Sequence, residues 1–282
     1  MAVYVYCPRS SNGALELVRA LGVKRLRKFD GLTFWSKKHK FTLNYGDTII
    51  CWGASVPEMD GIRVLNGLAN PTDKYVEHNR FVETGVSTIR AYQRLPKLGS
   101  GTILLPRVSN HRGGSDLLYP PTFSDYYVVK EDFTKEYRIH SFAGRSIRAG
   151  VKVPREGFKP VPENEWKPEA NLLHPWIRSF DGGWRIDYNN FQSTAPLRKL
   201  AHLAVKALEL TFGAVDLAEK ADGTIKVLEV NRSPGIEANT IQVYVRAINS
   251  WLEREKEKEE NDNEKPIVGP APLNDAEARE RL

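Results

Sequence analysis

Residues 213–231 read GAVDLAEKADGTIKVLEVN, which is two alternating runs joined by Asp222-Gly223. An Asp-Gly pair in this setting is typical of a two-residue type I′ turn in a β-hairpin. With the pair at the two central positions of the turn, Asp216 is predicted to lie directly opposite Glu229. Asn231 shares the face of Glu229, because residues two apart on a strand point the same way. The sequence therefore predicts a hairpin that gathers two carboxylates and one amide on a single face.

The other face of this hairpin is apolar and needs a cover. It consists of Val215, Leu217, Leu228 and Val230, which we expect to pack against helices. The residues just before the hairpin supply one helix, with Ser193 or Thr194 as cap, Pro196 in the first turn and Gly213 at the exit. Its apolar stripe is formed by Leu197, Leu200, Ala201, Ala204, Leu208 and Phe212.

Two facing carboxylates repel each other, at a cost of roughly 0.2–1 kcal/mol for an exposed cross-strand pair. Hard oxygen ligands without His or Cys favour Mg²⁺ or Mn²⁺ between them, and Mg²⁺ usually completes its shell with waters and nucleotide phosphates. Asp216, Glu229 and Asn231 therefore form a candidate metal site. The alternative is a solvent-facing strand surface that neighbouring Lys and Arg side chains neutralise.

The composition is that of an ordinary soluble protein, with 282 residues of which 41% are hydrophobic and 27% charged. No apolar run approaches the roughly 18–20 residues that a membrane-spanning helix needs, and the first residues do not resemble a secretion signal. Two cysteines, Cys7 and Cys51, are too few for a disulfide framework or a thiolate zinc site. We therefore expect a cytoplasmic protein without a membrane partner.

Charge is unevenly distributed along the chain. From Leu252 to the end, six Lys/Arg stand against ten Asp/Glu, a net of −4, so the remaining body carries +10 within a total of +6. A basic body attracts polyanions, and a nucleic acid, a nucleotide or an acidic substrate would each fit. Residues 253–282 combine low hydrophobicity with high charge density, which predicts a disordered tail.

The end of the predicted hairpin resembles a known family. Asp216, then Glu229 thirteen positions later, then Asn231 followed by Arg-Ser-Pro-Gly, is similar to the metal-binding end of the ATP-grasp carboxylate–amine ligases. The pattern resembles both glutamate-ligase-like and D-alanine–D-alanine-ligase-like members, with a looser likeness to compact members from bacteriophage genomes. Upstream strings keep the family's order, namely Asn66 before Asp73-Lys74, and EYRIH at 136–140.

The resemblance covers about residues 60–250 and implies an α+β / α/β fold, in which two α+β subdomains grip ATP behind a small open-sheet N-terminal domain. The expected domains are 1–67 and 68–252, the second divided into subdomains of about 68–124 and 125–252. The implied activity is ATP- and Mg²⁺-dependent joining of a carboxylate to an amine through an acylphosphate, with release of ADP and phosphate.

The resemblance also implies residues that contact the phosphates of ATP. Lys74 matches the family's early phosphate-contacting lysine, with a plain surface lysine as the alternative. Arg107 matches the second position, where the family usually has lysine, and this departure leaves the detailed phosphate geometry open. A lid whose backbone N–H groups approach the phosphates, or else a surface turn, is expected at His111, Arg112, Gly113 and Gly114.

Other residues match the family's contacts with the adenosine part. Lys130 and the backbone around Asp132 correspond to the segment that meets the purine edge. Glu136 corresponds to the carboxylate that accepts from the ribose hydroxyls, and Arg138 on the same strand belongs to the same nucleotide-contact set. A salt bridge between Glu136 and Arg138 is the alternative.

Catalysis needs positive charge where the phosphoryl group and the tetrahedral intermediate develop. Arg178 in WIRSFDGGW resembles an arginine of the ligases that add glutamate to a ribosomal protein, and it is the first candidate. Lys152 and Arg232 are the others. In D-alanine–D-alanine ligases an arginine stands two positions before the matching aspartate, where this chain has Ala214.

Two other functions compete with the ligase. One is a basic nucleic-acid-binding protein whose Tyr and Trp side chains stack on bases, and the two functions merge if the acceptor is linked to a nucleic acid or another macromolecule. The other is an ATP-grasp scaffold that binds nucleotide without catalysis. The sequence leaves open the acid, the amine, whether they are small molecules or macromolecules, and the oligomeric state.

Overall fold

The computed structural model describes residues 2–8, 11–30, 33–36, 39–67, 73–97, 102–108, 124–167, 170–236 and 238–264. The chain divides into two compact units, Met1–Val245 and Arg246–Leu282. Within the described residues, no helix has the length and apolar character needed to cross a bilayer.

The first unit begins with an open parallel sheet. Its strands are β1 (Val3–Tyr6), β2 (Lys24–Leu26), β6 (Thr48–Cys51) and β7 (Arg63–Leu65), in the order β2-β1-β6-β7. Helix α1 (Asn12–Leu21) connects β1 to β2. The spacing of Leu15, Val18 and Leu21 predicts a helix over 13–21, which this element confirms. Its N-cap Ser11 accepts a hydrogen bond from the Ala14 amide, which satisfies one of the amides that a helix start leaves unpaired.

A second, antiparallel sheet follows within the same region, where no strand is predicted from the sequence. It contains β3 (Lys28–Asp30), β4 (Thr33–Ser36) and β5 (His39–Thr42), in that order. Phe34 is fully buried and packs edge-on against Tyr6 of β1, with ring centroids 5.8 Å apart. One face of this sheet therefore belongs to the N-terminal core.

The next part of the chain forms a helix and a small sheet. Helix α2 (Lys74–Glu83) is capped by Asp73, whose Oδ1 accepts from the Tyr75 amide at 2.8 Å. The small antiparallel sheet has the strands β8 (Ala91–Tyr92), β9 (Leu104–Arg107) and β10 (Tyr126–Val129), in the order β8-β10-β9.

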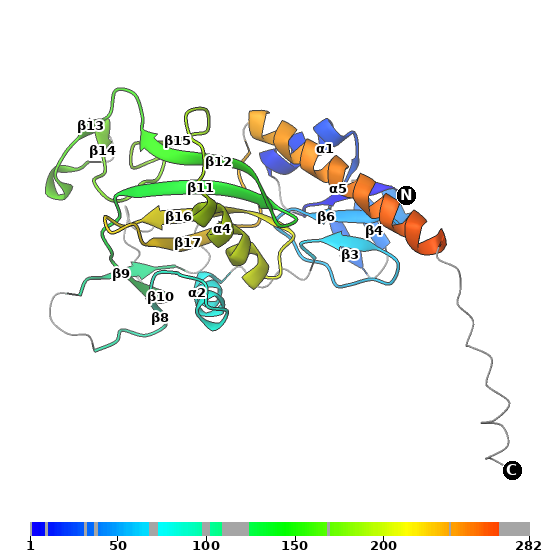
Figure 1. Ribbon diagram of the computed structural model, residues 1–282, viewed down its shortest axis with the longest axis horizontal. Helices are drawn as coiled ribbons and strands as arrows, with labels where there is room; N and C mark the ends of the chain where they lie inside the picture. The colour runs from blue at the N-terminus through cyan, green and yellow to red at the C-terminus, as the bar shows by residue number, and fades with distance from the viewer. Residues whose placement is uncertain are drawn as a thin grey trace, which may run out of the picture. The chain divides into compact units, whose positions relative to one another are not determined.

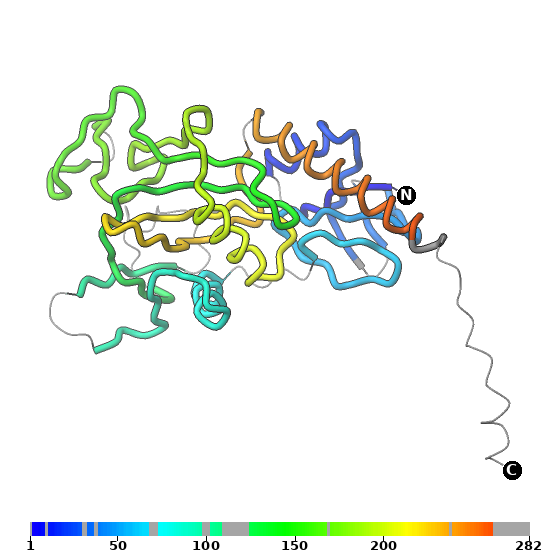
Figure 2. The backbone as a smooth tube through the Cα atoms, viewed as in Figure 1, coloured from blue at the N-terminus to red at the C-terminus, as the bar shows by residue number. Residues whose placement is uncertain are grey.

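A five-stranded antiparallel sheet carries the predicted hairpin. Its strands are β11 (Lys135–Phe142), β12 (Arg145–Pro154), β15 (Trp184–Asp187), β16 (Phe212–Glu219) and β17 (Ile225–Asn231), in the order β15-β12-β11-β16-β17. Figure 2 shows the green β11 beside the yellow β16, although they are far apart in sequence. Ala143-Gly144 between two strand-like runs predicts a hairpin. The structure confirms it, because both residues have positive φ, as a type I′ turn requires. The proline-rich stretch between β12 and β15 contains the short elements β13 (Lys159–Pro160), η1 (Glu163–Glu165) and β14 (Leu172–Leu173).

Helix α4 (Ala195–Ala207) covers one face of this sheet (Figure 1). Its start is as predicted, with Thr194 at the N-cap and a proline in the first turn. Its end is not, since the helix stops at Leu208 and Glu209 takes a left-handed φ of 57°. Gly213 lies instead inside β16, where a Cβ would approach Val230 Cγ1 to 2.8 Å. That glycine therefore serves strand packing and not helix termination.

Helix α5 (Ala238–Glu264) is longer than the sequence predicts. The sequence predicts a helix over Ala238 to Trp251, fraying into 253–260 within a disordered tail of 253–282, whereas the structure keeps the helix through 264. Charge pairs one turn apart accompany this extension, such as Lys258 with Glu255 at 2.6 Å. The tail prediction for 265–282 lies outside the described residues.

Asn66 connects the N-terminal sheet to the five-stranded sheet. It is 2% exposed and has a φ of 59°, a region that asparagine tolerates better than most residues. Its Oδ1 accepts from the amides of Thr211 and Phe212, and its Nδ2 donates to the Phe212 carbonyl at 2.9 Å. The Asn66 side chain thus satisfies backbone hydrogen-bonding groups at the start of β16.

Candidate functional site

The hairpin places its two carboxylates opposite each other, as predicted, but by a different route. Asp216 pairs with Glu229 in the β16–β17 register. The turn, however, is a three-residue loop, because the Lys220 carbonyl accepts from the Gly223 amide at 3.0 Å while the Lys220 amide donates to Thr224. A bulge between Asp216 and Leu217 then shifts the register back by one. The three-residue loop and the bulge shift the strand register in opposite directions, so Asp216 still lies opposite Glu229.

The bulge corrects the expectation for Leu228. This residue is predicted on the apolar face beneath the helices, together with Val215, Leu217 and Val230. Those three do pack in the core under α4, but Leu228 is the extra residue of the bulge and packs on the opposite side, against Tyr126 and its neighbours. The bulge thus brings an apolar side chain to the carboxylate face.

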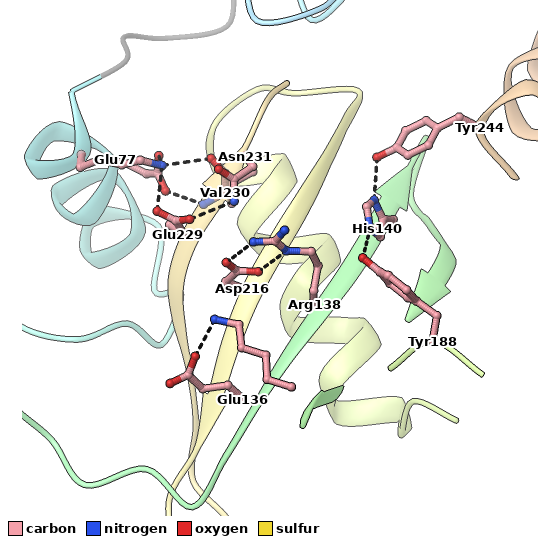
Figure 3. A network of polar contacts seen from close by, with 12 residues as sticks. Glu77, Glu136, Arg138, His140, Tyr188, Asp216, Glu229, Val230, Asn231 and Tyr244 are labelled. Atoms are coloured by element: carbon pink, nitrogen blue, oxygen red, sulfur yellow. Dashed lines mark hydrogen bonds and ion pairs between the residues drawn. The ribbon is translucent and has the colours of Figure 1, made fainter. Parts of the chain in front are cut away.

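Each carboxylate has a basic partner. Arg138 donates to Asp216 through two hydrogen bonds, Nε to Oδ1 and Nη2 to Oδ2, both 2.6 Å long. Glu229 accepts from Asn231 Nδ2 at 3.0 Å and lies 3.6 Å from Lys74 Nζ (Figure 3). Burial raises the pKa of Glu229, but the positive charge of Lys74, the hydrogen bond from Asn231 and the charges of Arg138 and Arg107 lower it by more, to about 2. Arg138 and Lys74 therefore supply the neutralising charge that the alternative interpretation expects, and the Glu229 carboxylate remains ionised.

Glu77 is a member of this network that the sequence did not indicate. Its Oε2 lies 3.2 Å from Lys74 Nζ, one helical turn away, and its Oε1 accepts from the Val230 amide at 2.6 Å. Burial lowers the pKa of Lys74, but Glu77 and Glu229 raise it by more, so the ammonium stays charged. The i,i+3 spacing from Lys74 to Glu77 was the available signal, although this spacing is common in solvent-exposed helices.

A cavity of about 490 Å³ opens over the carboxylate face. Its floor is the five-stranded sheet, and its other walls come from α2, the small β8-β10-β9 sheet and the segment before β15. The structure brings nine of the predicted site residues to this cavity. They are Lys74, Arg107, Lys130, Glu136, Arg138, Lys152, Arg178, Asp216 and Glu229.

Glu136 and Lys152 form an ion pair on the cavity floor. Lys152 Nζ lies 2.7 Å from Glu136 Oε2, and both side chains are largely buried. The salt bridge considered for Glu136 is thus made with Lys152, while Arg138 is held by Asp216. Burial lowers the pKa of Lys152, but Glu136 and Asp216 raise it by more.

Arg178 is fixed by backbone carbonyl groups. Its Nη2 donates to the carbonyls of Phe133 and Thr134, both at 2.9 Å, and its guanidinium lies 5.0 Å from the Trp184 ring centroid. Its Nε is buried and has no hydrogen-bond partner among the described residues. Burial lowers the pKa of the Arg178 guanidinium. The arginine thus lines the cavity with its buried Nε–H unused.

The end of the cavity near Arg178 is aromatic, which the sequence interpretation missed. Trp176, Trp184, Phe133 and Phe180 line it, and Lys130 Nζ lies 4.4 Å from the Trp176 ring centroid. The string WIRSFDGGW points to a site residue through its arginine alone in the sequence interpretation. Its two tryptophans and phenylalanine were the signal for a flat apolar ligand group.

Three of the predicted positions in the described part of the chain do not line the cavity, namely Asp132, Arg232 and Asn231. Asp132 is exposed and does not line the cavity, whereas its neighbours Glu131 and Phe133 do. Arg232 lines a separate, smaller cavity of about 250 Å³, together with Arg80. The predicted lid at 111–114 lies outside the described residues.

His140 extends the polar face of β11 beyond the cavity. It is fully buried, with Nδ1 3.1 Å from the Tyr244 hydroxyl and Nε2 3.0 Å from the Tyr188 hydroxyl (Figure 3). Burial, together with the positive charges of Arg138 and Arg148, lowers the pKa of His140 to about 3. The imidazole is therefore neutral in the folded protein.

This neutral histidine predicts a loss of stability in mild acid. The unfolded chain binds a proton near pH 6.5, so the contribution is complete above that pH and is lost as the pH falls toward 3. Between pH 7 and pH 5 we expect His140 to account for a decrease of about 2 kcal/mol in the free energy of unfolding. Urea unfolding measures this free energy at both pH values. Its decrease from pH 7 to pH 5 should be smaller in His140→Gln than in the wild type by that amount, whereas His39→Gln, at an exposed position, should behave like the wild type. Equal decreases in both variants would contradict the assignment.

No family model matches the sequence, and no curated protein sequence does either. Solved structures do match. The ATP-grasp ligase PsnB complexed with a minimal precursor, Mg and ADP superposes with a TM-score of 0.56 at 10% identity, over 89% of this chain and 98% of that one. The macrocyclase MdnC bound with precursor peptide MdnA, from Microcystis aeruginosa MRC, gives 0.55 at 10% identity over 88% and 100%. D-alanine–D-alanine ligase from Bacillus anthracis complexed with ATP gives 0.54 at 15% identity over 92% and 99%.

The chain therefore has the ATP-grasp fold, which confirms the fold class that the hairpin motif indicates. The similarity extends over nearly the whole length of those ligases.

Proposed function

We propose that this protein is an ATP- and Mg²⁺-dependent ligase that joins a carboxylate to an amine. The observation that carries the proposal is the cavity over the hairpin. Basic side chains and two facing carboxylates line one part of it, and aromatic side chains line one end. Its volume of about 490 Å³ lies within the range of small-molecule and cofactor sites, roughly 300–1,000 Å³. The ATP-grasp fold is consistent with this activity.

The lining divides into a part that suits a nucleoside and a part that suits phosphates. The aromatic end, with Trp176 and Trp184, offers flat apolar surface for the base, and Leu228 adds to the apolar wall. Lys74 and Arg107 come from α2 and β9 on the other side and provide positive charge for a triphosphate. We assign Glu136 to the ribose hydroxyls. On binding them, its carboxylate would either keep its ion pair with Lys152 or give it up.

The carboxylate face suits a hard divalent cation. Asp216 and Glu229 face each other on neighbouring strands, and Asn231 adds an amide on the same face. These are the oxygen donors that Mg²⁺ prefers, and their present partners Arg138 and Lys74 leave both groups on the cavity wall. When bound, Mg²⁺ would neutralise phosphate charge.

The proposed reaction has two steps. A substrate carboxylate oxygen attacks the γ-phosphorus of ATP, the bond to the bridging oxygen breaks and ADP leaves. An amine then attacks the carbonyl carbon of the acylphosphate, phosphate departs with its oxygen, and the amine loses a proton. Arg178 lies at the aromatic end, on the side assigned to the base. Lys152, on the cavity floor, therefore becomes the first candidate to stabilise the negative charge that develops on the transferred group.

We further propose that the functional division follows residues 1–67 and two subdomains of about 68–124 and 125–252, with the cavity between the last two. Residues from both proposed subdomains line it, such as Arg107 and Asp216. Arg232 is no longer a candidate for the chemistry because it lines the other cavity.

The experiment is ADP release from purified protein across a panel of acids and amines. Two of the similar structures hold precursors or a precursor peptide, so the panel includes peptides with Asp, Glu and Lys side chains besides amino acids and polyamines. We expect ADP release that requires both an acid and an amine and stops with EDTA. A protein that binds ATP yet releases no ADP with any pair would favour a nucleotide-binding scaffold, and one that binds no ATP would refute the proposal.

A further inference from the structure

The net positive charge of the chain is concentrated in one short segment. Residues 24–42 contain seven Lys/Arg and a single acidic residue, a net of +6, which equals the net charge of all 282 residues. The rest of the chain therefore balances to zero. This segment covers β2 to β5 and lies outside the cavity described above.

The antiparallel sheet of this segment has two unlike faces. On one face, Phe29, Phe34 and Phe41 occupy one row across the three strands, and they pack in the N-terminal core. This aromatic row fixes the sheet on the protein. The opposite face is consequently held outward as a stable surface.

A second row crosses the outward face. Trp35 of β4 lies directly between Lys28 of β3 and Lys40 of β5 in the strand register. Both lysines are exposed, and Trp35 is half-buried with Lys40 Nζ 5.9 Å from its ring centroid. Because neighbouring strands are about 4.8 Å apart, the two lysines are separated by roughly 10 Å with an indole between them. Arg27, just before β3, is also exposed.

We propose that this outward face of β3–β5 binds single-stranded nucleic acid. A flat aromatic side chain between two cations matches the alternation of base and phosphate along a single strand, in which the base stacks and the phosphates pair with ammonium groups. An acidic peptide would also be attracted by the charge, but its carboxylates give no role to the tryptophan at the centre. The row, and not the charge alone, favours the nucleic acid.

The test is the binding of a fluorescein-labelled oligothymidylate of roughly 15 nucleotides, followed by fluorescence anisotropy over a range of salt concentrations. No ATP is present, so the outcome is independent of the proposed ligase activity. We expect Lys28→Gln/Lys40→Gln to weaken binding about tenfold. The slope of log K against log salt should fall by about 1.4, since each phosphate contact on a single strand contributes about 0.7.

Trp35 separates stacking from charge. We expect Trp35→Ala to weaken binding about tenfold without changing the salt slope, and Trp35→Phe to restore most of the affinity. The matched control is Lys199→Gln/Lys206→Gln, which removes two exposed lysines from α4 and should leave affinity and slope close to the wild-type values. Circular dichroism of each variant shows whether the fold is kept.

Three results would overturn the proposal. The first is absence of oligonucleotide binding by the wild type at low salt. The second is an equal loss in the α4 control, which would indicate non-specific attraction by net charge. The third is tight binding of a polyglutamate peptide combined with an oligonucleotide affinity that Trp35→Ala leaves unchanged, which would make the surface a site for acidic peptides.

Discussion

Glu229→Gln should lower the rate of ADP formation by about a thousandfold. Glutamine keeps the size of the side chain and removes its charge, so the divalent cation loses one of its two carboxylates and Lys74 loses a partner at 3.6 Å. The measurement is coupled ADP release with the acid and amine that the panel identifies. Calorimetry with a non-hydrolysable ATP analogue adds a readout that needs no substrate, because the strengthening of its binding by Mg²⁺ should disappear.

The control for this substitution is Glu156→Gln, which makes the same chemical change at an exposed position outside the cavity. Its ADP release and its Mg²⁺ dependence should equal those of the wild type. Normal turnover in Glu229→Gln would remove the carboxylate pair from the proposed metal site and would leave the cavity without an assigned cation.

Arg138→Leu should destabilise the folded protein by about 3–5 kcal/mol. The substitution leaves the buried Asp216 carboxylate, which is 4% exposed, without its two hydrogen bonds of 2.6 Å. For a domain of this size the midpoint of thermal unfolding should fall by roughly 10 °C. Thermal and urea unfolding are measured in EDTA, so that no cation replaces the missing guanidinium.

The double variant Arg138→Leu/Asp216→Leu distinguishes a broken ion pair from a packing defect. Since apolar groups often replace a buried ion pair with little cost, the double variant should recover most of the lost stability even though it has no ligase activity. If the two single losses simply add in the double variant, the pair does not couple and the contact does not account for the destabilisation.

The sequence predicted those parts of the fold that local pattern determines. The β11–β12 hairpin follows from Ala143-Gly144, and the start of α4 follows from its cap and proline. The end of α4 was not predictable from local pattern, because Glu209 adopts a left-handed conformation that glutamate rarely takes. The β3–β5 sheet was also missed, since its strands are only three or four residues long and their stability comes from Phe34 packing in the N-terminal core.

The same limit applies to the candidate site. Motif order located the residues that the cavity gathers, including Lys74, Asp216 and Glu229. It did not give their partners, because a strand pattern does not say that Arg138 will pair with Asp216 and Lys152 with Glu136. Those choices depend on the order of strands across the sheet, which places β11 between β12 and β16.

The bulge at Leu228 has a consequence for detecting distant relatives of this protein. Asp216 and Glu229 are thirteen positions apart, and two kinds of hairpin can pair residues at this separation. One has a two-residue turn and no bulge, and the other has a three-residue loop and a bulge. Only the second sends a leucine into the cavity wall. A chain that has lost both Ala221 and Leu228 would still hold its carboxylates face to face, only eleven positions apart. An ungapped comparison of such a chain with this one would miss their similarity, whereas an alignment that permits both single-residue deletions would detect it.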